Sequence, residues 1–379
     1  MPPTPVTDTA GHHSAHAQRS GVPAPRSLPL DDIAARFRRN DLVVSVADVR
    51  EYAEVEALSR AADPHEMFLP VTADVLAWFA DQNPHGPGFV VIARPPGGGA
   101  VVGYFLFYAT TLVQTVAGVD RTVPAYLYVN LYVSPEYRRK GVFATMFAFG
   151  LEVLNRMGIR FAYTVPNPRS SPGFVKFGVP WLGTLPCWVA PALAAWRSLA
   201  ALTSSGNAGV TAARVSAFDE SMILTRNRSG VVRGLRTPEA LNWRFARRPG
   251  IEYGIWRIER RGSAAGCVVT RVMTIQRRRV LAICDLDLDR FDAAAIRGAL
   301  GAICRQTADR RYALVMVQGG PPDPASRRAL WRAGLIHVPD RLLPQPVAVL
   351  GGDPQQRGST GGFPPLNQWA LTPCDWDVF

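Results

Sequence analysis

The sequence has little lysine, few cysteines and no long apolar run. Only Lys140 and Lys176 are lysines among 42 basic residues, so arginine carries almost all of the positive charge. The five cysteines show no CxxC or CxC spacing, which argues against a disulfide framework and is typical of a reducing, cytoplasmic compartment. No stretch reaches the apolar length needed to cross a bilayer. Neither GxGxxG nor GxxxxGK[ST] occurs, so two common phosphate-binding loops are excluded.

Length and composition bound the fold class. A chain of 379 residues with 47% apolar side chains is long enough for two domains, each with its own core. The formal net charge of +12 favours anionic partners such as nucleic acid, anionic lipid or a phosphate-rich ligand. Residues 1–38 are expected to form a disordered tail, because most of them are rich in Pro, Ser, Thr and His and lack the apolar core of a signal peptide.

Two runs of strand and helix patterns divide the chain. The first covers 39–195 and reads as a strand, two helices, three strands, a helix, a strand and a short helix. A looser segment, 196–213, links it to a second run of similar order over 214–350, and residues 351–379 are expected to form a C-terminal tail. The repeated order predicts an α/β (α+β) architecture of two related domains in tandem.

The third strand of the first run and the turn after it form the clearest candidate site. Strict alternation in AYLYVNLYV predicts a core face with Leu127, Val129, Leu131 and Val133, and a cleft face with Tyr126, Tyr128, Asn130 and Tyr132. The turn SPEYRRKG then opens a helix, whose free N–H groups and positive dipole end bind anions. Gly141 allows the backbone to approach a phosphate closely, and three cations precede it. The sequence therefore predicts a pyrophosphate cradle.

The segment YVSPEYRRKGVFATMF resembles the acyl-CoA-binding motif of the GNAT superfamily of N-acetyltransferases, Arg/Gln-x-x-Gly-x-Gly/Ala. Arg138 and Gly141 match, and Phe143 departs at the last position. The resemblance implies a GNAT fold, a mixed central sheet flanked by helices, with acetyl-CoA or another acyl-CoA as co-substrate. It implies these cofactor-binding residues: Leu131, Val133, Arg138, Arg139, Lys140, Gly141, Val142, Phe143, Ala144, Asn167 and Ser170. The second half resembles the C-terminal region of bacterial tandem-GNAT proteins, some of which are associated with cell-surface polysaccharide synthesis.

The resemblance implies transfer of an acyl group to an amine. In the superfamily the amine attacks the thioester directly and a backbone N–H at the end of the motif strand polarises the carbonyl, so Val133 is expected there. Tyr128 and Asn130 are the further catalytic candidates. Phe174 stands where many relatives carry a proton-donating tyrosine, and it has no proton to give. The expected acceptor is a small-molecule amine, with an amino sugar of a surface polysaccharide precursor as the class to try first. No metal is expected.

The segment ICDLDLD places Asp285, Asp287 and Asp289 on one strand face. It does not fit a calcium loop, because Arg290 and Ile296 stand where glycine and glutamate are required. Two interpretations stay open: Asp285 and its neighbours hold a cationic or hydroxylated acceptor, or they form a solvated strand end.

Three other functions remain open from the sequence. Phe174 and the lack of a carboxylate on the cleft face would suit a non-catalytic acyl-CoA-binding module. The charge would suit a nucleic-acid-binding protein, but the arginines are spread along the chain among acidic residues, so nucleic acid is not expected as a partner. Membrane association is not expected either. A tRNA-dependent aminoacyl transferase is disfavoured by the intact pattern from Arg138 to Gly141.

Overall fold

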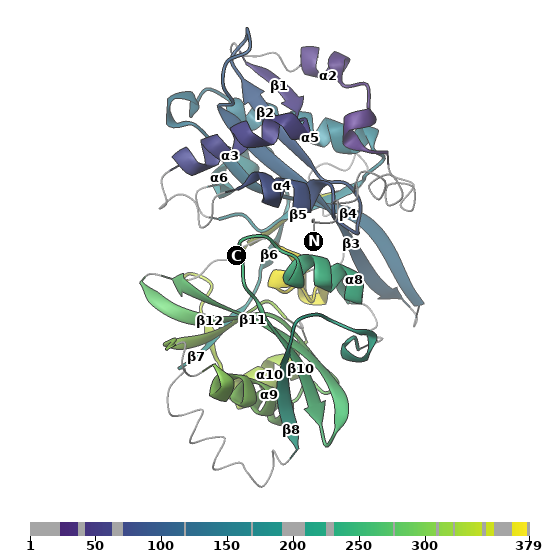
Figure 1. Ribbon diagram of the computed structural model, residues 1–379, viewed down its shortest axis with the longest axis vertical. Coiled ribbons are helices and arrows are strands. Elements are labelled where there is room, and N and C mark those ends of the chain that lie inside the picture. Colours follow the sequence, from purple (N-terminus) through teal and green to yellow (C-terminus); the bar gives the residue numbers. More distant parts are fainter. Residues whose placement is uncertain are drawn as a thin grey trace, which may run out of the picture. The chain divides into compact units, whose positions relative to one another are not determined.

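The computed structural model describes residues 23–36, 42–62, 71–116, 119–167, 170–191, 209–224, 231–275, 277–307, 311–320, 323–342, 346–351 and 366–376. The chain divides into two compact units, Met1–Thr110 with Pro124–Ala162, and Thr111–Val123 with Tyr163–Phe379 (Figure 1). This division differs from the boundary predicted at 196–213. The second unit takes residues 111–123 from within the first run of elements, which no pattern of composition indicates.

The first unit is a sheet with helices packed on it. Its strands follow the order β1-β2-β3-β4-β5, and the β1–β2 and β2–β3 pairs are antiparallel. The strands are β1 (Val43–Val46), β2 (Phe89–Arg94), β3 (Gly103–Val116), β4 (Val119–Val133) and β5 (Phe161–Thr164), of which the last three also have residues in the second unit. The helical segments are η2 (Pro25–Ser27), α2 (Asp31–Arg36), η3 (Val49–Glu51), α3 (Tyr52–Ala61), α4 (Ala73–Ala80), η4 (Pro135–Tyr137) and α5 (Val142–Arg156).

Aromatic rings fill the core between α5 and the sheet. Phe89 stacks on Phe107 with ring centroids 4.8 Å apart, and Phe147 of α5 lies 6.1 Å from Phe105. Gly150 makes this approach possible, because a Cβ atom there would lie 2.2 Å from the Phe107 ring. The apolar spacing of α5 thus positions the helix, and its N-terminus, firmly at the end of β4.

The predicted disordered tail over 1–38 is too long. Residues 25–27 and 31–36 are helical, and Pro25 is buried. Arg26 donates hydrogen bonds to Tyr52 and to the carbonyl of Ala47, and it forms a 3.0 Å ion pair with Asp81. These contacts fasten the segment to the first unit, while residues 1–22 lie outside the described part of the chain.

The second unit is built on a seven-stranded sheet of order β14-β7-β13-β12-β11-β10-β8. β12 and β13 are parallel, and the other neighbouring pairs are antiparallel. The strands are β7 (Cys187–Pro191), β8 (Val210–Val215), β10 (Gly254–Arg260), β11 (Ser263–Ile275), β12 (Arg278–Leu288), β13 (Leu314–Gln318) and β14 (Ile336–Val338). Helices α9 (Ala293–Gln306) and α10 (Pro324–Arg332) pack together over one face of this sheet (Figure 1).

The opposite face of this sheet carries a second core. It packs against η5 (Glu220–Met222), α8 (Pro238–Leu241) and the π-helical η6 (Asn242–Ala246). The remaining elements are α6 (Ser171–Lys176), the antiparallel pair β6 (Trp181–Thr184) and β15 (Pro346–Gly351), and β9 (Val232–Gly234), which pairs with residues 112–114 of β3. Three strands, a helix, a strand and a helix follow one another from β10 to α10 as they do from β2 to α6. A tandem duplication stays a prediction.

The predicted C-terminal tail over 351–379 is partly wrong. Residues 366–376, here called the C-terminal strap, contain η9 (Leu366–Gln368) and η10 (Pro373–Asp375) and pack into the second unit. Trp369, Leu371 and Trp376 of the strap are at most 2% exposed. The segment NQWALTPCDW is apolar and aromatic, and burial of these side chains outweighs the cost of ordering it. Among the described residues, no helix is long and apolar enough to span a membrane.

Candidate functional site

The turn between β4 and α5 is anchored at its start and open at its end. The amide of Ser134 donates to the Val102 carbonyl at 2.9 Å, and η4 forms through a 2.9 Å hydrogen bond from the Tyr137 amide to the Ser134 carbonyl. The four residues that follow, Arg138 to Gly141, are all exposed. A fixed base and an exposed rim are what a binding loop on a rigid scaffold requires.

Two residues of this turn have left-handed backbone conformations. Gly141 has a φ of 81° and is the N-cap of α5, while Arg139 has a φ of 62°, which is uncommon for a residue with a side chain. Such strained conformations persist only where the surrounding structure holds them in place, and they cluster at binding sites. The turn that the sequence predicts as the cradle therefore has a defined backbone shape, and its binding of pyrophosphate stays a prediction.

The first turn of α5 has the electrostatics of an anion site. The amides of Val142, Phe143 and Ala144 precede the first intrahelical donor, the Thr145 amide, which bonds to the Gly141 carbonyl at 3.0 Å. No described side chain caps this turn, and it contains no acidic residue. Unlike the cations beside it, the Val142 side chain is buried in the core, so only its backbone can contact a ligand.

The basic side chains of the cradle are held over aromatic rings. Arg138 Nε donates to the Val133 carbonyl at 3.0 Å, and its guanidinium lies 5.6 Å from the Tyr132 ring centroid. Lys140 Nζ lies 5.1 Å from the Tyr137 ring centroid. These contacts fix two charges beside the helix N-terminus at exposed positions. They also join Arg138 directly to the backbone of Val133, the predicted oxyanion donor.

The strand before the turn departs from the predicted alternation. Asn130 has a φ of 50°, which a regular strand does not contain, so β4 has an irregularity of the kind found in β-bulges. Beyond it, Leu131 and Val133 are half-buried rather than core residues, as is Asn130 itself. The irregularity therefore lies three residues before Val133, at the end of the strand that leads into the cradle.

The interpretation of the tyrosine face as a cleft wall is wrong. Tyr126, Tyr128 and Tyr132 are at most 8% exposed. The Tyr126 hydroxyl donates to the Pro87 carbonyl at 2.6 Å. Tyr128 is fully buried 5.3 Å from the Phe147 ring, and burial raises the pKa of its hydroxyl well above the ordinary value. Phe147 of α5 covers Tyr128, and Tyr132 instead packs beside Tyr104 with ring centroids 6.1 Å apart, so Tyr128 belongs to the core and is no longer a catalytic candidate.

Two predicted cofactor residues lie in the second unit. Asn167 is exposed, and its Oδ1 accepts a hydrogen bond from the Ser170 amide at 3.0 Å, which begins the turn into α6. Phe174 in that helix is 2% exposed and packs as a core residue. The part of Asn167 and Ser170 in cofactor binding stays a prediction. Leu131, Val133, Phe143 and Ala144 lie half-buried around the cradle itself.

Comparison with known proteins identifies the fold. No protein-family model matches the sequence, and no curated protein matches it. Solved structures match at low identity. A probable N-acyltransferase of unknown function from Enterococcus faecalis has a TM-score of 0.55 and 13% identity, over 81% of this chain and 72% of that one. A GCN5-related N-acetyltransferase from Kribbella flavida has a TM-score of 0.53 and 18% identity, over 82% of this chain and 70% of that one. Another GCN5-related N-acetyltransferase, from Anabaena variabilis, has a TM-score of 0.51 and 11% identity, over 81% of this chain and 72% of that one.

The chain has the fold of the GCN5-related N-acetyltransferases. The predicted GNAT fold is therefore confirmed, and the matches extend over both units because they cover about four-fifths of the chain. Within this GCN5-related fold, the β4–α5 turn places exposed cations beside a helix N-terminus, an arrangement that favours anions.

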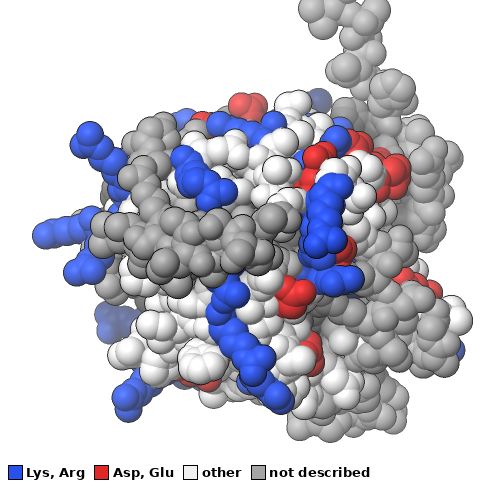
Figure 2. Space-filling view, turned by 90° about the horizontal axis from the view of Figure 1, so that it is seen from below, with Lys and Arg blue, Asp and Glu red and all other residues white. Residues whose placement is uncertain are grey.

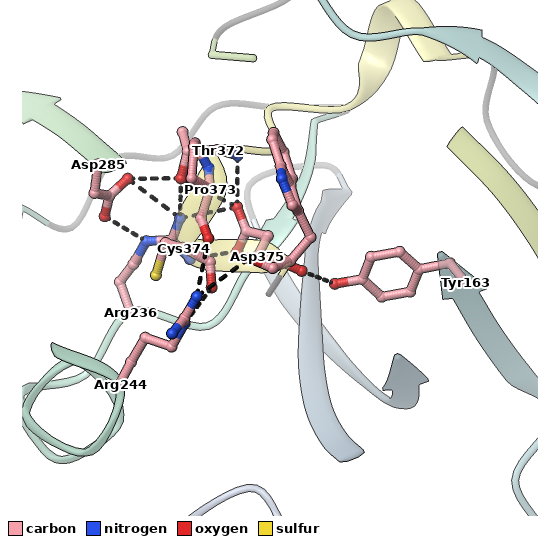
Figure 3. Close-up of polar contacts among 9 residues, drawn as sticks. Tyr163, Arg236, Arg244, Asp285, Thr372, Pro373, Cys374 and Asp375 are labelled. Carbon is pink, nitrogen blue, oxygen red and sulfur yellow. Dashed lines mark hydrogen bonds and ion pairs between the residues drawn. The ribbon is translucent and has the colours of Figure 1, made fainter. Parts of the chain in front are cut away.

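A buried ionic cluster occupies the second unit of the GCN5-related fold (Figure 3). Arg236 Nε donates to Asp285 at 2.9 Å, and its two terminal nitrogens donate to Asp375 at 2.7 and 2.9 Å. The Thr372 hydroxyl donates to Asp285 at 2.9 Å and also accepts from Arg236 at 3.1 Å. Burial alone would lower the pKa of Arg236, but the two adjacent carboxylates raise it well above its ordinary value. The guanidinium therefore stays charged.

This cluster fastens the C-terminal strap. Arg244 donates to the carbonyls of Pro373, Cys374 and Trp376 at 3.2 to 3.3 Å, and the Tyr163 hydroxyl donates to the Asp375 carbonyl at 2.6 Å (Figure 3). Asp285 is 4% exposed, so it neither reaches an acceptor nor forms a solvated strand end. Both interpretations are therefore wrong for Asp285 itself, and an acceptor-holding role of its neighbours stays a prediction. Only the apolar character of the strap sequence could have indicated the docked segment.

Proposed function

We propose that this protein is an acyl-CoA-dependent N-acyltransferase that uses acetyl-CoA and acylates a small-molecule amine. The observation that carries the proposal is the turn from Arg138 to Gly141, where a left-handed glycine, uncapped helix amides and three cations come together on a GCN5-related fold. The diphosphate of CoA fits this donor set, because helix amides and basic side chains both stabilise negative charge that is spread over several oxygens.

The residues of the first unit have distinct roles in this proposal. The amides at the start of α5 and the side chains of Arg138, Arg139 and Lys140 hold the phosphates. The backbone amide of Val133 donates to the thioester carbonyl, and the link from Arg138 to the Val133 carbonyl keeps that residue in place. The co-substrate supplies an activated acyl group, whose transfer breaks a C–S bond and forms a C–N bond. Asn130, beside the irregularity of β4, helps position the acceptor.

The proposed proton transfers use no side-chain acid or base. Phe174 cannot protonate the leaving thiolate, and Tyr128 is buried, so the proposal includes no tyrosine acid. Thiolates are good leaving groups, and positioning the amine supplies much of the rate enhancement. Water accepts the proton of the attacking amine. The proposed compartment is the reducing cytoplasm, in accord with five free cysteines.

Calorimetry with acetyl-CoA tests the cradle. The variant Arg138→Ala/Gly141→Asp should bind about 100-fold more weakly, since it loses a charge-assisted hydrogen bond and gains a repelling carboxylate. A matched control exists at the other end of α5: Gly158 also has a positive φ, of 73°, with open space around it, and Arg160 is exposed. Gly158→Asp/Arg160→Ala should bind as the wild type does. Equal loss in both variants would refute the cradle.

A turnover assay then separates catalysis from binding. Thiol release from acetyl-CoA is followed with a panel of amines, beginning with amino sugars of surface polysaccharide precursors. Binding without turnover across the panel would favour the alternative of a non-catalytic acyl-CoA-binding module. Failure to bind acetyl-CoA or longer acyl-CoAs would refute the transferase itself.

A further inference from the structure

The outer face of α10 exposes a tryptophan among arginines. Trp331 is 66% exposed, although tryptophan is usually mostly buried. Arg327 and Arg328 precede it by four and three positions, so they lie on the same side of the helix, and Arg332 follows it. All three arginines are exposed. We call these four residues the α10 outer face.

The exposure of Trp331 is built into the helix. The inward side of α10 is filled by Ser326, Ala329 and Leu330, and a left-handed Gly334, with a φ of 94°, then turns the chain so that Leu335 enters the core. Ala329, Leu330 and Leu335 are therefore the side chains by which this segment contributes to the core of the second unit. Trp331 contributes nothing to it, and a large apolar side chain left outside a complete core indicates an interaction surface.

The charge of this face is not balanced locally. None of its three arginines forms an ion pair with a carboxylate in the described part of the chain. The nearby Asp323 caps the start of α10, where it accepts hydrogen bonds from the amide and hydroxyl of Ser326 at 2.8 and 2.7 Å. Arg297 of α9 reaches the other end and donates to the Arg332 carbonyl. Positive charge therefore surrounds Trp331.

The same character extends beyond the helix. Ile336 of β14, a strand that contacts α10, is 62% exposed. Figure 2 views the molecule from the end where α9 and β8 lie in Figure 1, and basic side chains project over much of its described surface while acidic ones occupy less of it. The charge of this unit thus suits an extended anionic surface.

We propose that the α10 outer face docks the protein on an anionic lipid bilayer. Arginine beside tryptophan is the combination that binds at the boundary of headgroups and acyl chains, where the indole lies among the headgroups and the cations bind lipid phosphates. A nucleic acid would use the arginines and could stack on Trp331. It would gain nothing from an exposed isoleucine such as Ile336, so the observations favour the bilayer. The expectation of no membrane association rested on apolar runs alone, which do not detect such a face.

Vesicle co-sedimentation of the full chain tests this proposal. Vesicles of phosphatidylcholine with phosphatidylglycerol should bind the protein, pure phosphatidylcholine vesicles should not, and binding should weaken with salt. Arg327→Gln/Arg328→Gln/Arg332→Gln should bind about 100-fold more weakly, at roughly fivefold for each arginine. Trp331→Ala should bind roughly tenfold more weakly, as a lost apolar anchor.

A control triple matches the charge change. Arg277, Arg278 and Arg279 are exposed at the β11–β12 turn, and replacing all three by glutamine should leave vesicle binding within a few-fold of the wild type. The proposal is overturned if this control loses as much affinity as the α10 triple, or if neutral vesicles bind equally well. It is also overturned if a single-stranded oligonucleotide binds through the α10 outer face while anionic vesicles do not bind. Unchanged thermal unfolding of each variant shows that the loss is not a folding defect.

Discussion

Replacing Arg236 by methionine should destabilise the second unit strongly. The Arg236 side chain is 10% exposed, and its partners Asp285 and Asp375 are 4% and 2% exposed as side chains. Methionine keeps the length of the side chain but removes all five hydrogen bonds that the guanidinium donates. Two buried carboxylates then face each other without a cation. Breaking a buried ion pair from one side costs about 3–5 kcal/mol, because the remaining charge is left uncompensated.

For a unit of this size, that loss lowers the midpoint of thermal unfolding by roughly 6–20 °C. A guanidinium titration followed by tryptophan fluorescence measures the loss of unfolding free energy. The signal reports on the second unit because Trp369 and Trp376 of the C-terminal strap are both buried. Arg214 provides the control: its ion pair with Glu252 is exposed, at 45% and 67%, so Arg214→Met should cost less than about 1 kcal/mol. Equal losses in the two variants would refute the argument that burial of the cluster sets its energy.

Three further predictions concern the core and the thiols. Tyr128→Phe should leave kcat within about threefold of wild type, since the hydroxyl is buried away from any substrate; a large loss in a steady-state assay would restore it as a catalytic candidate. Gly150→Ala should cost about 1–3 kcal/mol in a denaturant titration through overpacking against Phe107, and a neutral result would contradict the packing of α5 on β3. Burial raises the pKa of Cys187 and of Cys284 to about 12, whereas an unfolded thiol has about 8.5. The stability from these protonated thiols is complete below pH 8.5 and is lost as the pH rises toward 12, so guanidinium midpoints should fall between pH 8 and pH 10 and native thiols should resist labelling at pH 9.

The features that the sequence predicts well depend on neighbouring residues. The strands and helices from β2 to α5 follow from alternation and helical spacing within single segments, and the cradle consists of consecutive residues around Gly141. The face of β4 was predicted wrongly because strict alternation assumes a regular strand. The left-handed Asn130 and the covering helix α5 decide which side chains are buried, and neither is visible in a pattern of period two.

The ionic cluster could not be predicted, because its members are far apart in the chain. Arg236 is 49 residues from Asp285 and 139 from Asp375. Each of these residues, taken alone, looks like an ordinary exposed charge, and charged residues are seldom buried unless they are paired. Pairing at such separations follows from the tertiary fold and from no local spacing.

The C-terminal strap has a consequence for how the protein is made. Synthesis proceeds from the N-terminus, and the first unit can form its contacts as soon as residue 162 has emerged from the ribosome. The second unit must wait, because Trp369 pairs with Val232 and Asp375 neutralises Arg236 only after almost the whole chain has been translated. Until then Arg236 and Asp285 lie beside a core that lacks two tryptophans. A ribosome-stalled chain ending before residue 366 should therefore be protease-sensitive in its second half, with its first half already protected.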